Sequence, residues 1–199
     1  GQAWATDATQ IDILDLRRVV FRNPQVDNFL RLRNKCFLVG TKGQGKTLLL
    51  TYKRHLLSQV TDSRENERGL CFVPQGRPYL DFMSELKTLS ARFEKPLSEL
   101  STCKRFWTMA LRVSAVSNHP GVISADEEDE LEIFPPRFQR WIRGQRIEPT
   151  VVFKELTNLS ISQANALVDD SETFLDQKLR SIHSSTYFFI DKVDQAVRR

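Results

Sequence analysis

The stretch KCFLVGTKGQGKTLLL, residues 35–50, decides how the rest of the chain is interpreted. It contains the pattern G-x-x-x-x-G-K-[ST], which Gly40, Gly45, Lys46 and Thr47 fill. Glycines let a backbone curl until its N–H groups point at phosphate oxygens, and a helix that follows offers its positive end to the same anion. The lysine would neutralise the β- and γ-phosphates, and the threonine hydroxyl would ligate Mg²⁺. We therefore predict that a nucleotide binds to Gly40, Thr41, Lys42, Gly43, Gln44, Gly45, Lys46, Thr47 and Leu48.

Apolar residues lie on both sides of this loop. Residues 36–39 form a short apolar run that predicts a buried strand, and apolar side chains from Leu49 to Val60 recur at helical spacing. A second short run, residues 70–73, ends at Pro74 and predicts a second parallel strand. A strand, a crossover helix and another strand make a right-handed βαβ unit.

The composition of the 199 residues, 40% hydrophobic and 27% charged, is that of a globular protein. No run approaches the roughly 18 apolar residues of a membrane span, and no signal peptide is visible, so we expect a cytoplasmic chain without membrane contact. The net charge of +4 permits a nucleic-acid partner but does not require one. The cysteines, Cys36, Cys71 and Cys103, and the three histidines lack ligand spacing, which predicts buried free thiols and no metal beyond nucleotide-bound Mg²⁺.

Helical periodicity dominates residues 78–185. An acidic run at 125–132 is interpreted as a solvated loop or helix start. After two prolines, the segment Arg137–Arg143 places Phe138 and Trp141 on one face and its arginines on another. Basic charge interleaved with aromatics suits a contact with nucleic acid or a partner protein. The simpler interpretation is an amphipathic helix with its aromatics in the core and its arginines in water.

A second motif lies near the end of the chain. Residues 186–190 form an apolar, β-prone run that stops at Asp191. The carboxyl end of a neighbouring parallel strand is where a carboxylate would organise Mg²⁺ opposite Thr47. Asp194 follows in a D-x-x-D pattern, while Lys192 stands where many ATPases place the glutamate that polarises the attacking water.

The two motifs, GTKGQGKT and YFFIDKVD, resemble those of P-loop ATPases of the AAA+ and STAND groups. Large bacterial ATPases of anti-phage defence systems are similar around the loop and in the helical insertion before the second motif. The resemblance implies ATP and Mg²⁺ as cofactors, Lys46, Asp191 and Asp194 as catalytic residues, and Thr47 and Asp191 as metal ligands. Gln195 stands where STAND proteins usually have glutamate, so the resemblance does not identify the general base.

These observations predict an α/β fold: a P-loop NTPase core with an incomplete parallel sheet and a large, mostly helical insertion. The expected parts are an arm and pre-strand helix at 1–34, a P-loop βαβ unit at 35–77, a helical insertion at 78–185 and a strand with the second motif at 186–199. Because eight residues follow Asp191, we expect an N-terminal fragment of a larger homo-oligomeric ATPase, which can lack activity by itself.

The predicted function is an ATP-binding and ATP-hydrolysing module that uses Mg-ATP to drive conformational change in an oligomer, with anti-phage defence as the process that the resemblance implies. Two alternatives stay open. One is a nucleotide-dependent scaffold that binds protein or nucleic acid through Arg137–Arg143 without efficient hydrolysis, and the other is a P-loop kinase. A GTPase is disfavoured because the chain contains no N-K-x-D base-reading motif.

Overall fold

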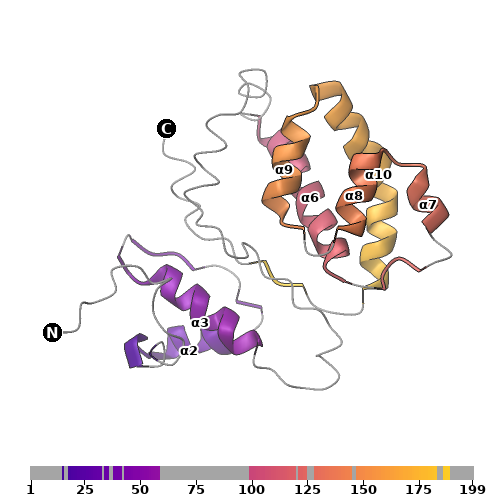
Figure 1. Cartoon of the computed structure of the whole chain (residues 1–199). Helices are drawn as coiled ribbons and strands as arrows, with labels where there is room; N and C mark the ends of the chain where they lie inside the picture. The colour runs from indigo at the N-terminus through magenta and orange to yellow at the C-terminus, as the bar shows by residue number, and fades with distance from the viewer. Residues whose placement is uncertain are drawn as a thin grey trace. The chain divides into compact units, whose positions relative to one another are not determined.

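The computed structural model describes residues 15, 18–32, 34–35, 38–41, 43–58, 99–119, 121–124, 128–144, 147–182 and 186–188. The chain divides into two compact units (Figure 1). Unit 1 contains the described residues up to Ser58, and unit 2 contains those from Glu99 to Phe188.

The main helices in the described part of unit 1 are α2 (Pro24–Arg31) and α3 (Lys46–Ser58). Helix α2 begins with Pro24 in its first turn, where proline costs no hydrogen bond, and the Asn23 side chain accepts the Val26 N–H at 2.8 Å. The two helices pack around a small core, whose buried members are Val20, Phe29, Leu30 and Tyr52.

A buried lysine ties α3 to the chain that leaves α2. Lys53 is 4% exposed, and its Nζ donates to the carbonyl oxygens of Leu32 at 3.0 Å and Lys35 at 2.6 Å. The same ammonium lies 4.4 Å from the centre of the Phe29 ring. Carbonyls at a helix C-terminus and the face of an aromatic ring both attract a cation. Lys53 therefore fixes, against α3, the segment that leads into the glycine-rich loop.

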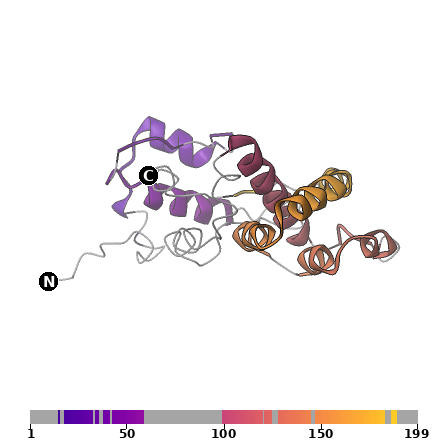
Figure 2. The ribbon, with the colours of Figure 1, turned by 90° about the horizontal axis from the view of Figure 1, so that it is seen from above.

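Unit 2 is a bundle of five described helices: α6 (Leu100–Ser117), α7 (Glu128–Glu132), α8 (Pro136–Arg143), α9 (Pro149–Thr157) and α10 (Ile161–Ser181). Helix α6 contacts α8, α9 and α10, and Figure 2 shows the same helices from above. Its core contains side chains that are almost completely buried: Phe106, Val113, Leu131, Phe138, Trp141, Val152, Phe153, Leu156 and Leu175.

Ion pairs show how α6 and α10 are aligned. Arg105 pairs with Asp169, and two turns later Arg112 pairs with Glu172 at 3.2 Å and Asp176 at 3.3 Å. Because both residue numbers increase together along the contact, the two helices run in the same direction. Exposed pairs of this kind contribute about 0–1 kcal/mol each, so they help to set the register more than the stability.

The ends of several helices follow from local sequence signals. Pro136 and Pro149 each lie in a first turn, and the Gly144 N–H donates to the Arg140 carbonyl at 2.8 Å where α8 ends. Ser160 and Gln163 form a reciprocal capping box at the start of α10. The helical interpretation of Arg137–Arg143 is confirmed by the bounds of α8.

The predicted α/β fold is wrong for the part of the chain that the structure describes. Of those residues, 71% are helical and none lies in a strand. Val39, expected inside a buried strand, is 94% exposed, and residues 186–188 are neither helix nor strand. The predicted strand at 70–73 and residues 36–37 and 189–190 lie outside the described residues. A short apolar run cannot by itself predict a strand, which forms only where a second strand pairs its backbone groups.

Candidate phosphate-binding loop

The glycine-rich loop leads directly into α3, whose first residue is Lys46. Gly43 has a φ of 87° and Gly45 a φ of 70°, a left-handed conformation that glycine adopts without a steric penalty. These two residues turn the chain sharply enough for the loop to fold back on itself. The structure therefore explains why glycine stands at both positions.

The Lys46 side chain folds back over the loop. Its Nζ donates to the carbonyl oxygen of Gly40 at 2.7 Å and to that of Thr41 at 2.9 Å. The ammonium therefore lies against the loop backbone, at the start of α3. The positive end of the helix dipole acts in the same place.

The first turn of α3 adds hydrogen-bond donors to this charge. The Leu49 N–H donates to the Gly45 carbonyl at 3.0 Å, and the helical pattern of bonds begins there. The N–H groups at the start of an α-helix have no carbonyl acceptor within the helix itself. Those groups, the helix dipole and Lys46 together favour an anion at this end of α3.

A side-chain amide also takes part in the loop. The Oε1 of Gln44 accepts the Thr41 N–H at 3.0 Å, and the Gln44 N–H donates to the Thr41 carbonyl at 3.4 Å. The sequence pattern leaves this position unspecified. The sequence therefore predicts that Gln44 belongs to the loop, but it does not predict that the Gln44 side chain binds Thr41.

The predicted metal and catalytic set is described only in part. Thr47 is half-buried in the first turn of α3, and the Thr51 hydroxyl donates to its carbonyl at 2.9 Å. Lys42, Asp191 and Asp194 lie outside the described residues. In the described ranges, no group of three or more His, Cys, Asp or Glu side chains could hold a metal ion. The described chain thus supplies the Thr47 hydroxyl and Lys46 to the predicted site.

Sequence reasoning missed Lys53, the second lysine of α3 that binds backbone carbonyls. It follows Lys46 by seven residues, so both lie on one face of the helix. Lys46 holds residues 40–41 and Lys53 holds Leu32 and Lys35. The spacing of two helical turns was the signal that could have indicated a shared face.

The aromatic face of α8 lies in the core of unit 2. Phe138 and Trp141 are 0% exposed, and Phe138 packs edge-on against Phe174 with ring centres 5.9 Å apart. The indole Nε1 of Trp141 donates to Glu155 at 2.9 Å. These aromatics therefore stabilise the bundle and are not presented to a partner.

The arginines of α8 are paired with acidic side chains of the same unit. Arg140 lies 2.6 Å and Arg137 3.8 Å from the Glu155 carboxylate, while Arg143 lies 2.7 Å from Glu128. Glu128 belongs to the acidic run that was interpreted as a solvated loop or helix start. The simpler, amphipathic interpretation of α8 accounts for these contacts, and a nucleic-acid or protein partner stays a prediction.

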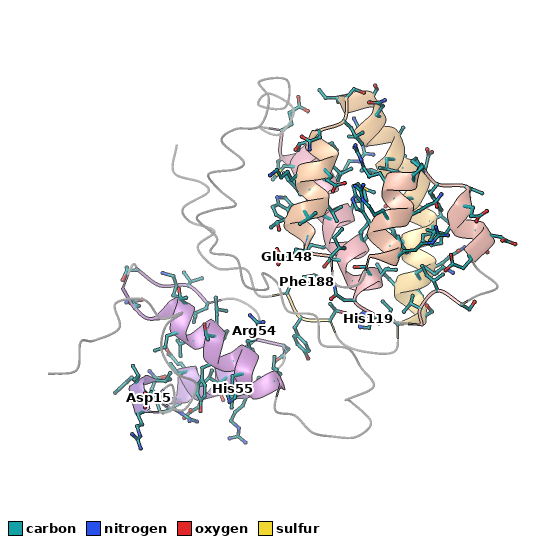
Figure 3. The ribbon with its side chains drawn as sticks, in the orientation of Figure 1. Asp15, Arg54, His55, His119, Glu148 and Phe188 are labelled. Carbon is teal, nitrogen blue, oxygen red and sulfur yellow. The ribbon has the colours of Figure 1, made fainter. Side chains whose placement is uncertain are left out.

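The described histidine and cysteine of unit 2 are structural. His119 is 7% exposed at the end of α6 (Figure 3), where its Nδ1 donates to the Ala115 carbonyl at 2.6 Å. The Thr186 hydroxyl lies 3.5 Å from the other ring nitrogen. Cys103 is a free, half-buried thiol, and burial raises its pKa. A raised pKa keeps the thiol protonated and lowers its reactivity.

No protein-family model, curated protein or solved structure matches this chain. Within the described ranges, none of the helices combines the length and apolar character needed to cross a membrane. The resemblance to P-loop ATPases therefore stays a prediction.

Proposed function

We propose that residues 40–48 bind the phosphates of ATP, and that the chain is the nucleotide-binding module of a larger ATPase in which nucleotide occupancy drives a conformational change. One observation carries the proposal: the Lys46 ammonium lies 2.7 and 2.9 Å from two loop carbonyls at the start of α3. The proposal depends on the loop and this helix and does not require a sheet.

The chemistry of this arrangement favours phosphate over the contacts now made. A carbonyl oxygen is a neutral acceptor, whereas a phosphate oxygen carries a negative charge, so an ammonium–phosphate contact adds a direct attraction between opposite charges that an ammonium–carbonyl contact lacks. Lys46 can exchange the carbonyls of Gly40 and Thr41 for a phosphate by rotating its flexible side chain. The N–H groups of the first turn of α3 then face the same anion.

Hydrolysis would require more than phosphate binding. A magnesium ion bound with the nucleotide supplies positive charge at the β- and γ-phosphates, and the Thr47 hydroxyl is the described group that would hold it. Asp191 and Asp194 are the carboxylates that we propose for the second ligand and for the catalytic role. Neutralising Lys46 should weaken nucleotide binding, because this lysine belongs to the loop. Neutralising Asp191 or Asp194 should lower hydrolysis with less effect on binding, so the variants separate the two steps.

The other predicted functions receive less support. A scaffold that binds nucleic acid or protein through Arg137–Arg143 would have to compete with the ion pairs to Glu155 and Glu128. A kinase requires an acceptor site, and no observation on the described residues favours one. Assembly into a homo-oligomer and a cytoplasmic location remain predictions from the sequence.

Replacing Lys46 with alanine tests the proposal. We expect Mg-ATP affinity, measured by isothermal titration calorimetry, to fall about 10- to 100-fold, because a hydrogen bond to a charged group contributes about 1.5–3 kcal/mol. Lys104→Ala is the matched control, since Lys104 is an exposed lysine of α6. Equal affinity of the wild-type and Lys46→Ala proteins would contradict a phosphate site at this lysine.

A further inference from the structure

Gln44 holds the backbone of Thr41 from inside the loop. Its carboxamide oxygen accepts the Thr41 N–H at 3.0 Å, and its own N–H donates to the Thr41 carbonyl at 3.4 Å. The Lys46 ammonium donates to the same carbonyl at 2.9 Å. Both backbone polar groups of Thr41 are thus engaged by Gln44 and Lys46.

The missing side chain of Gly40 makes room for this contact. A Cβ placed on Gly40 would lie 2.3 Å from the Gln44 Oε1, well inside van der Waals contact. Gly40 is not in the left-handed region, so glycine is not required there by its backbone conformation. The space at Gly40 is instead filled by the Gln44 carboxamide.

We propose that the Gln44 carboxamide competes with a phosphate for the Thr41 N–H, and so lowers the affinity of the loop for its ligand. This inference rests on the proposed phosphate site. A phosphate that enters the loop is attracted by the Thr41 N–H and by the Lys46 ammonium. At present the N–H donates to Gln44, and the ammonium donates to loop carbonyls. Because the Thr41–Gln44 contact is exposed and neutral, a charged phosphate oxygen displaces it at modest cost.

The competition predicts opposite effects for two kinds of substitution. Gln44→Ala removes the competing acceptor, and Gln44→Met removes it while keeping a side chain of similar length. Both should bind Mg-ATP about two- to tenfold more tightly than the wild type, the range that one neutral hydrogen bond contributes. Gln44→Glu places a carboxylate against the Thr41 N–H, on the residue whose carbonyl Lys46 binds, and this charge both holds the N–H more strongly and repels phosphate. Its affinity should be at least about tenfold weaker than that of the wild type.

The test is a calorimetric titration of the full chain with Mg-ATP for the wild type, these three variants and Lys46→Ala. Gln177→Ala, at an exposed position of α10, is the control and should bind like the wild type. Tighter binding by both Gln44→Ala and Gln44→Met supports the competition. If Gln44→Met binds no more tightly than the wild type, the competition is overturned.

The same titrations separate this inference from the proposed function. If wild-type binding depends on Lys46 but Gln44→Ala and Gln44→Met bind equally or more weakly, Gln44 supports the ligand and only the competition is wrong. If no protein in the series shows Lys46-dependent binding, the proposed phosphate site fails and the inference fails with it.

Discussion

Trp141→Ala should lower the free energy of unfolding of unit 2 by about 3–5 kcal/mol, the usual cost of truncating a fully buried aromatic side chain. The indole is 0% exposed, and its ring centre lies 6.3 Å from that of Phe138 in an edge-on arrangement. Its N–H also donates to Glu155, which accepts from Arg140. Alanine would leave a cavity in the core and remove a donor from this carboxylate.

Urea denaturation followed by circular dichroism at 222 nm measures this loss, since most of the described helix lies in unit 2. Trp141→Phe is the graded control, because it retains an aromatic ring and removes only the N–H donor and part of the volume. Its cost should therefore be clearly smaller than that of alanine. A loss below about 1 kcal/mol for Trp141→Ala would mean that α8 does not pack into the core as described.

Lys53→Ala should destabilise unit 1 by about 1–3 kcal/mol, the cost of leaving one acceptor, the Lys35 carbonyl, without its donor. The ammonium donates to the Lys35 carbonyl, it shares the Leu32 carbonyl with the Lys35 N–H, and it also lies over the Phe29 ring. The Leu32 carbonyl keeps the Lys35 N–H at 3.3 Å after truncation, so its loss adds little to that cost. Amide hydrogen exchange should accelerate in α3 and stay unchanged in α6.

Two variants test the cause of that effect. Lys53→Met keeps an apolar stem over Phe29 but removes the ammonium, so its loss should approach that of alanine if the carbonyl contacts matter most. Lys104→Ala, at an exposed position of α6, should leave exchange in α3 unchanged. Wild-type exchange rates in α3 of Lys53→Met would show that packing of the stem, and not the charge, holds the two helices together.

The parts of the fold that local chemistry controls could be predicted from the sequence. Two prolines before a basic and aromatic segment act within a few residues, so the helix α8 could be predicted from its own sequence. The predicted strands failed because a strand depends on a distant partner. The exposure of Val39 is the direct sign of that failure.

The candidate site likewise has features that the local sequence predicts and features that depend on distant residues. Gly43 and Gly45 could be predicted because their positive φ angles require glycine whatever surrounds them. The acceptors of Lys53 could not, since they are backbone carbonyls that lie 18 and 21 residues earlier in the chain. The arginines of α8 were consistent with two interpretations until their partners, Glu155 and Glu128, were placed beside them.

The most direct measurement of the central claim is a titration of ¹⁵N-labelled protein with Mg-ATP, followed through backbone amide resonances. If residues 40–48 bind the phosphates, the amides of Gly43, Gly45 and Lys46 should shift first and furthest, while those in the middle of α10 stay in place. These loop shifts should disappear in Lys46→Ala. Shifts confined to α8, or loop amides that do not move at millimolar Mg-ATP, would contradict a phosphate-binding role for the loop.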